Sequence, residues 1–173
     1  MRPFSSLLRA RRGSAAAEMA LVAPLLLALG IGSVELGNFM LDQHRLTKSV
    51  RDAARYAARA PFSAFSACTS TASNVASLAT GVTNLVRTGQ LSGGTDQLPN
   101  WGNAASSVTV QMRCSTAQVG GQTMSGIYAG YSSGAAVVIV SGTLRYQPLV
   151  GAFGFRGTGF DLYAQEEAPV AGV

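Results

Sequence analysis

Residues 11–29 read RRGSAAAEMALVAPLLLAL, and this stretch decides the architecture. Its only carboxylate, Glu18, stands at the start of an apolar segment that carries no other charge as far as Val34. A charged group at the edge of a membrane segment is costly. We therefore expect Glu18 to have a function of its own.

The uncharged run, residues 19–34, is slightly shorter than the roughly 20 residues that cross a bilayer. It reaches that length if residues 15–17 are included, or if the helix continues around Glu35 to Leu41, so we place the span at about residues 15–41. Pro24 is tolerated in a membrane helix, usually as a kink. Glu35 either marks the outer boundary of the span or faces a partner helix, and we favour an interfacial acid.

The helical pattern continues beyond the span as an amphipathic extension over residues 42–60. Small and apolar residues recur there at spacings of three and four, which places them on one helix face. They are Leu46, Val50, Ala53 and Ala57, and the basic residues Lys48, Arg51, Arg55 and Arg59 lie opposite. Pro61 ends the run. We therefore predict one long helix over residues 14–60.

Residues 61–173 are predicted to form a small extracytoplasmic α+β domain. Apolar residues from Val75 to Val86 repeat at three and four, with Ser73 as a candidate N-cap and Gly89 after the end. Strand patterns follow at residues 108–114, 135–146 and 160–165. A short helix and a three-stranded antiparallel sheet can pack on the upper half of the long helix.

The charge distribution argues against a nucleic-acid partner. The formal net charge is +5 over 173 residues, but four arginines and no acid precede Gly13. The rest of the chain therefore carries nine basic and eight acidic residues. The basic character belongs largely to the leader, and nucleic-acid binding is not expected.

No set of residues points to catalysis. His44 is the only histidine and lies just past the apolar segment, where an interfacial surface residue is the simpler interpretation. Asp161, Glu166 and Glu167 cluster near the C-terminus without an identifiable catalytic partner. No metal-ligand spacing or cofactor motif is found. We expect neither an enzyme nor a cofactor.

The two cysteines, Cys68 and Cys114, both follow the apolar segment and are not in a C-x-x-C motif. If this part of the chain lies outside the cytoplasm, a disulfide is permitted. The alternative is two separate buried thiols. We favour the disulfide.

Residues 1–13 form a short basic leader. An ordinary signal peptide is cleaved at small residues after its apolar region, and here only Ala28/Gly30 and Gly30/Gly32 offer such pairs. The sharper candidate is Gly13, which lies between the arginines and the apolar helix. Cleavage there would leave the helix attached to the mature protein.

Residues 12–26, RGSAAAEMALVAPLL, resemble the N-terminus of TadE-like pseudopilins. These belong to the tight-adherence (Tad/Flp) branch of the type IV pilus and secretion systems. Residues 51–59 are also similar to that family, as is the strand at residues 137–140 followed by Pro148 and Leu149.

The resemblance implies that a prepilin peptidase cuts between Gly13 and Ser14. Glu18 would then be the fifth mature residue, matching the acidic residue of the family's motif. There it would pair with the N-terminal amine of a neighbouring subunit, since an amine and a carboxylate in lipid each cost less when paired. The alternative is a headgroup-level charge that snorkels.

The resemblance also implies a single-pass protein of the inner membrane with a cytoplasmic N-terminus, retained there or in the pilus. The basic residues do not decide this orientation, because arginines lie on both sides of the span. The implied partners are prepilin peptidase, other pilins and pseudopilins, Tad assembly platform proteins and the lipid bilayer.

Two other functions remain open on the residues alone. One is an unprocessed single-span membrane protein with a small extracytoplasmic binding domain. The other is a secreted binding or enzyme domain freed by an ordinary signal peptidase. The first residue of the mature chain separates all three: Ser14 for the pseudopilin, near Met1 for the unprocessed protein, or after Gly30 or Gly32 for the secreted domain.

Overall fold

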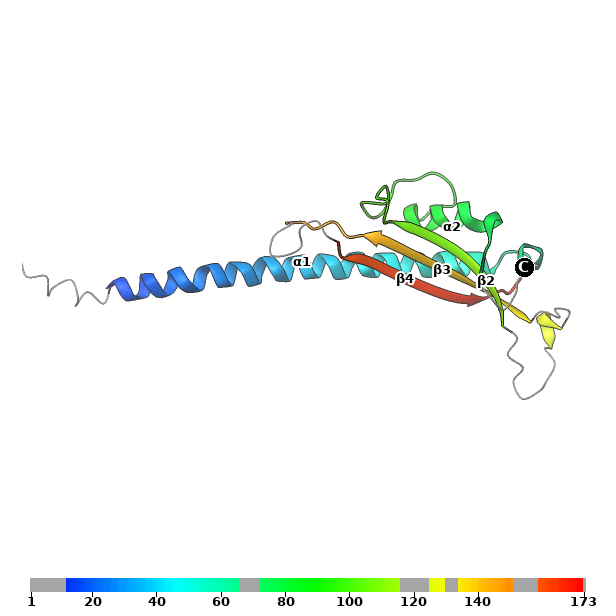
Figure 1. Ribbon diagram of the computed structural model, residues 1–173, viewed down its shortest axis with the longest axis horizontal. Helices are drawn as coiled ribbons and strands as arrows, with labels where there is room; N and C mark the ends of the chain where they lie inside the picture. Colours follow the sequence, from blue (N-terminus) through cyan, green and yellow to red (C-terminus); the bar gives the residue numbers. More distant parts are fainter. Residues whose placement is uncertain (1–11, 66–71, 116–124, 130–133, 151–158, 173) are drawn as a thin grey trace, which may run out of the picture.

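The computed structural model describes residues 12–65, 72–115, 125–129, 134–150 and 159–172. One long helix, α1 (Arg12–Ala58), dominates the molecule: its 47 residues span about 70 Å. The N-terminal half of α1 projects away from the rest of the chain, and its C-terminal half carries the folded domain (Figure 1).

The boundaries of α1 lie two residues earlier than the sequence predicted at each end. At the C-terminal end, the amides of Arg59 and Ala60 bond to the carbonyls of Tyr56 and Ala57 in a closing turn, and Pro61 follows. Pro24 lies inside α1. The expected single helix is therefore present.

The domain contains a four-stranded antiparallel sheet in which neighbouring strands follow one another along the chain. Its order is β1 (Ser73–Asn74), β2 (Ser107–Ser115), β3 (Ala135–Arg145) and β4 (Asp161–Pro169). The sequence predicted three strands, and that number is wrong. Strand β1 has only two residues, opposite Met112 and Gln111, which is too short for an alternating pattern to reveal it.

A second helix, α2 (Ala76–Thr88), follows β1 directly, and short 3₁₀ turns lie at η2 (Phe62–Phe65) and η4 (Gly126–Tyr128). Ser73 is a strand residue, so it is not the N-cap. Val75 holds that position without a side-chain cap hydrogen bond. Gly89 ends α2 in the left-handed conformation, with φ of 74°, and its N–H bonds to the Leu85 carbonyl, as glycine at a helix C-terminus allows.

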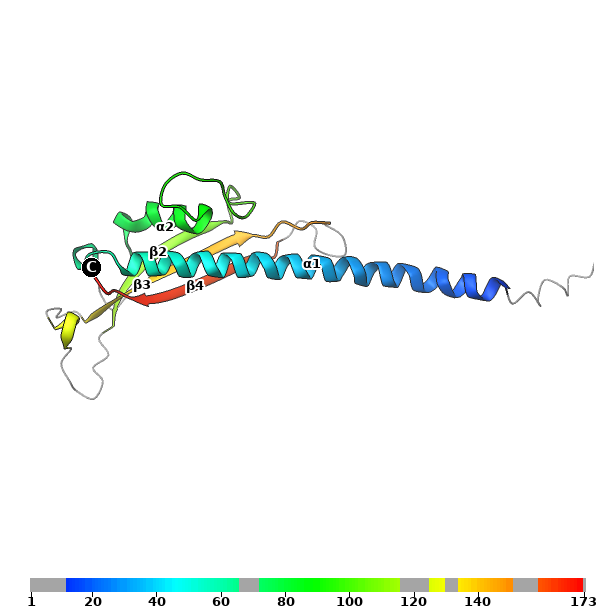
Figure 2. The ribbon, with the colours of Figure 1, turned by 180° about the vertical axis from the view of Figure 1, so that it is seen from behind.

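Both helices pack on the same face of the sheet, α1 over β3 and β4 and α2 over β2. Figure 1 shows α1 running behind the strands, and Figure 2, seen from the opposite side, shows α1 in front of them, with α2 beside it in both views. The helix face predicted from the spacing of three and four is confirmed as the buried one: Leu46, Ala53 and Ala57 are fully buried, and Val50 is nearly so.

The helix α1 lies close to the sheet at Gly142 on β3. A Cβ atom at this position would lie 3.1 Å from a methyl of Val50 and 3.3 Å from a methyl of Leu46. Glycine therefore lets the helix lie flat on the strand. The facing core side chain of α2 is Val86, 3.8 Å from the same point.

The C-terminus returns to the end of α1. The amide of Ala171 bonds to the carbonyl of Ala58 at 2.9 Å, and Val170 is fully buried. The opposite end of the sheet, where β3 ends and β4 begins, faces the N-terminal half of α1 (Figure 1). This end of the domain lies against the apolar part of the helix.

Candidate functional site

The predicted processing site lies at the start of α1. Gly13 and Ser14 belong to its first turn, and Glu18 follows one turn later with an exposed side chain. A Cβ atom at Gly13 would meet nothing within 4 Å. The folded chain therefore does not require glycine there, and any requirement must come from a partner that recognises this segment.

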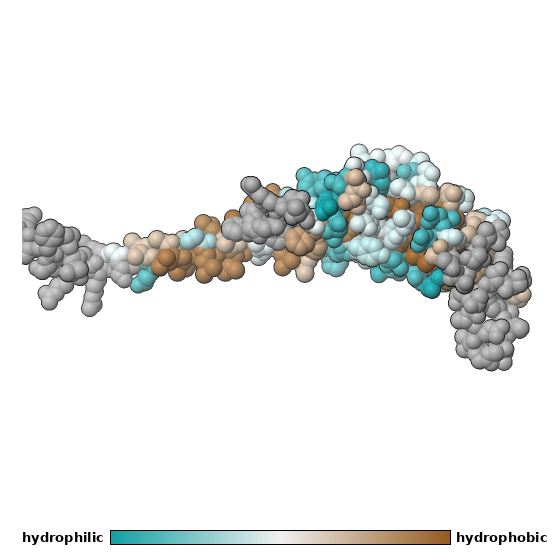
Figure 3. Space-filling view, in the orientation of Figure 1, coloured by the Kyte–Doolittle hydropathy of each residue, from teal (hydrophilic) through white to brown (hydrophobic). Residues whose placement is uncertain are grey.

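The N-terminal half of α1 is exposed and apolar. Large hydrophobic side chains stand out from Met19, which is 63% exposed, to Leu41, which is 57% exposed. Figure 3 shows mostly hydrophobic residues along this part of the helix, and we call the exposed apolar surface from Met19 to Leu41 the apolar band. Among the described residues, α1 is the one helix long and apolar enough to cross a membrane.

A buried carboxylate, Glu35, lies in the same part of α1. Glu35 is only 2% exposed, and its carboxylate accepts hydrogen bonds from the segment that follows β3. Its Oε1 accepts from the Tyr146 hydroxyl at 2.7 Å and from the Leu149 amide at 3.0 Å. Its Oε2 accepts from the Val150 amide at 3.1 Å. A single side chain of α1 thus holds the turn at the base of the domain.

Tyr146 is the centre of this contact. Asn38 donates from Nδ2 to the Tyr146 hydroxyl oxygen at 3.0 Å, and the ring of Phe39 meets the Tyr146 ring edge-on at 5.2 Å between centroids. Burial raises the pKa of Tyr146, and the neighbouring Glu35 carboxylate raises it further. The hydroxyl is therefore held in the protonated form that can donate to the carboxylate.

The structure shows contacts of Glu35 that the sequence interpretation did not include. Its carboxylate faces neither water nor a partner helix but its own domain. One signal was available: Glu35, Asn38, Phe39 and Asp42 follow the same spacing of three and four as the core face above them. The donors themselves lie more than a hundred positions away, so no local pattern could name them.

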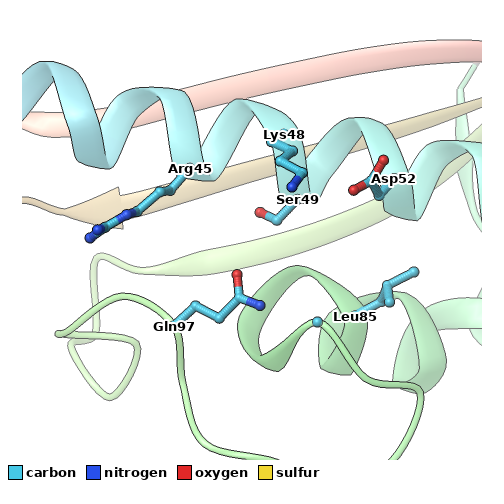
Figure 4. A pocket seen from close by; sticks show the side chains of 7 residues that line it. Arg45, Lys48, Ser49, Asp52, Leu85 and Gln97 are labelled. Carbon is cyan, nitrogen blue, oxygen red and sulfur yellow. The ribbon is translucent and has the colours of Figure 1, made fainter.

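A shallow groove of about 540 Å³ separates α1 from α2. Figure 4 shows Arg45, Lys48, Ser49 and Asp52 of α1 facing Gln97 and Leu85 across it. The groove carries both signs of charge, from Arg45, Lys48 and Asp52, and is open to solvent.

Three acids lie close together near the C-terminus in the sequence. In the structure, each of them lies beside a different arginine. Arg145 lies 3.2 Å from Asp161, Arg51 lies 3.6 Å from Glu166, and Arg113 lies 2.7 Å from Glu167. His44 is exposed on α1. Across the described residues, no three His, Cys, Asp or Glu side chains come together to hold a metal ion.

The predicted disulfide is described only at one end. Cys114 lies near the end of β2 and is 6% exposed, while Cys68 lies outside the described residues. The pairing therefore stays a prediction.

Comparison with known proteins bears on the N-terminal motif. Residues 13–55 match the family model described as TadE-like protein. The chain carries a TadE-like segment. The resemblance stated from residues 12–26 and 51–59 is thereby confirmed. The TadE-like segment starts at Gly13, includes Glu18 and Glu35, and ends near the C-terminus of α1.

The TadE-like match covers most of α1 and does not extend into the domain that follows it. Searches among curated proteins and among solved structures found no match. The domain that follows α1 is therefore interpreted from its own geometry.

Proposed function

We propose that this chain is a pseudopilin, a pilin-like structural component of Tad/Flp pilus assembly. The observation that carries the proposal is the continuity of α1. The same helix begins at the TadE-like motif, presents an exposed apolar surface for more than four turns, and then forms the core of the domain. A subunit built this way can be held in a bilayer or in a filament by one end and present its domain at the other.

In this proposal, a prepilin peptidase cleaves after Gly13 and leaves Ser14 as the mature N-terminus. The open surroundings of Gly13 support a recognition role for this residue, because its own fold would accept a larger side chain. The helix stays attached after cleavage and anchors a single-pass protein in the inner membrane, with its N-terminus cytoplasmic and the domain beyond residue 60 outside.

Glu18 acts in assembly. Its exposed position one turn from the mature N-terminus suits an ion pair with the amine of Ser14 on a neighbouring subunit. Such a pair lowers the cost of placing either charge in lipid. Other pilins, pseudopilins and the Tad assembly platform are the partners that the proposal implies.

The test combines N-terminal sequencing with assembly. The mature chain is expected to begin at Ser14. A chain that begins near Met1 would support instead the unprocessed single-span protein, and one that begins after Gly30 or Gly32 a secreted domain. Replacement of Gly13 by leucine should block maturation. If this bulky variant matures as fast as the wild type, cleavage after Gly13 is wrong.

The role of Glu18 is tested on the matured protein. Glu18→Ala should leave cleavage and membrane insertion intact and sharply lower pilus yield, or co-purification with other Tad components. Met19→Ala is the matched control, because Met19 is an exposed neighbour of Glu18 on the same helix turn. Normal assembly with Glu18→Ala would disprove the proposed ion pair and would leave the TadE-like match unaffected.

A further inference from the structure

Three exposed apolar side chains gather at the base of the domain. Leu149 is 63% exposed, Val150 52% and Phe160 56%. Phe160 lies beside the turn because its carbonyl accepts from the amide of Tyr146 at 3.0 Å. This end of the sheet faces the N-terminal half of α1 (Figure 1). We call Leu149, Val150 and Phe160 the basal patch.

The hydrogen bonds to Glu35 fix the height of the basal patch along α1. The exposed apolar band of the helix runs from Met19 to Leu41, which is about 33 Å at 1.5 Å per residue. This length matches the hydrocarbon core of a bilayer, about 30 Å. Glu35 lies about 9 Å below the upper end of the band. The amides of Leu149 and Val150, bound directly to Glu35, lie at the same depth.

A turn at this depth must satisfy its backbone groups, because an unpaired N–H in an apolar medium costs several kcal/mol. Both amides of the turn are satisfied by the Glu35 carboxylate, and the same carboxylate takes the Tyr146 hydroxyl. The side chains of Leu149 and Val150 point to the outside of the molecule. Two amides of the turn are therefore paired inward, while the apolar side chains of Leu149 and Val150 face outward.

The same contacts account for a carboxylate within the apolar band. A charge at this level is expensive when unpaired. Glu35 has three donors supplied by its own chain and needs no partner helix. The basal patch therefore lies at the level of residue 35, within the length of α1 that carries exposed apolar side chains.

We propose that the basal patch is a second membrane contact, which inserts into the outer part of the hydrocarbon core of the lipid bilayer beside α1 and is held there by Glu35. The proposal rests on the proposed function only in taking α1 as the membrane anchor. This second contact holds the domain against the bilayer at a fixed angle, which a single helical anchor would not do.

The test uses tryptophan fluorescence in phosphatidylcholine vesicles whose acyl chains are brominated close to the headgroup. Leu149→Trp should be quenched several-fold more strongly than Leu91→Trp. Leu91 is the matched control, because it is 50% exposed but lies in the loop after α2. The parent protein, with its buried Trp101, supplies the background. Equal quenching of the two variants would overturn the proposal.

A third variant separates this proposal from the membrane anchorage itself. Leu27→Trp lies in the middle of the exposed band and should be quenched by lipids brominated deep in the acyl chains. Quenching at Leu27→Trp without quenching at Leu149→Trp rejects the basal patch and keeps the anchor. No quenching at either position rejects the anchor and the patch together. Blue-shifted, unquenched emission at Leu149→Trp would indicate cover by a second copy and also reject the lipid contact.

Discussion

Glu35 of α1 and Tyr146 at the end of β3 are joined by a 2.7 Å hydrogen bond although 111 positions separate them in the chain. The bond ties the exposed apolar half of the helix to the base of the domain. A second tie, from the amide of Ala171 to the carbonyl of Ala58, lies at the far end of the domain. Together they fix the sheet along α1 at both ends.

The first prediction concerns the Glu35 carboxylate. Glu35→Gln should weaken the attachment of the turn, because an amide NH₂ would face a backbone donor that the carboxylate now satisfies. Loss of a hydrogen bond to a charged group costs about 1.5–3 kcal/mol. Hydrogen exchange at Leu149 and Val150, measured in detergent micelles, should speed up. Asp52→Asn, on the exposed surface of the same helix, is the control. Unchanged exchange in Glu35→Gln would show that the contact is not maintained in solution.

The second prediction concerns pH. The pKa of Tyr146 is raised above its ordinary value of 10.0, first by burial and then by the Glu35 carboxylate. The folded state therefore holds this proton more tightly than the unfolded chain does. The resulting stability is complete below pH 10 and is lost as the pH rises through the raised pKa of the folded state.

Tyr146→Phe should remove this dependence. The variant keeps the ring that meets Phe39 but loses the hydroxyl, at a cost of about 0.5–1.5 kcal/mol near neutral pH. The stability difference from the wild type should shrink above pH 10. Thermal unfolding in micelles across that range measures it, with Tyr163→Phe, an exposed tyrosine of β4, as the control. A stability difference that stays constant with pH would contradict the attribution of this pH dependence to the Tyr146 hydroxyl.

The third prediction concerns the close approach of α1 to β3. Gly142→Leu should destabilise the domain by about 1–3 kcal/mol or more, because Val50 and Leu46 already fill the space that a Cβ would enter. Gly102→Leu is the control, since nothing lies within 4 Å of a Cβ there. Melting temperatures of the two variants compare them directly. Similar values would mean that the helix can move away from the sheet at little cost.

The fourth prediction concerns the cysteines. We expect one intramolecular disulfide between Cys68 and Cys114, worth about 2–4 kcal/mol. The burial of Cys114 near the end of β2 supports a structural rather than a reactive role. Mass mapping of non-reduced protein isolated from membranes should find the linked peptides, and reduction should lower the melting temperature. Two thiols that are freely alkylated without reduction would disprove the pairing.

The sequence by itself determined the long helix and its two surfaces. The uncharged run after Glu18 and the three–four spacing from Leu46 onward depend on residues a few positions apart, because a helix repeats every 3.6 residues. The longer strands were also predictable, since alternation in residues 108–114 is a local signal. The strand β1 was missed because two residues cannot show a period.

Only the tertiary structure decided what Glu35 does. Its partners, Tyr146, Leu149 and Val150, lie 111 to 115 positions away in the chain. They reach the carboxylate because the sheet lies along α1 and brings the end of β3 back to the level of residue 35. A backbone amide carries no signature in the sequence, so two of these three donors are invisible until the chain has folded. In the local sequence, Glu35 is a charged residue within an apolar segment. In the folded chain, its carboxylate binds the base of the domain to α1.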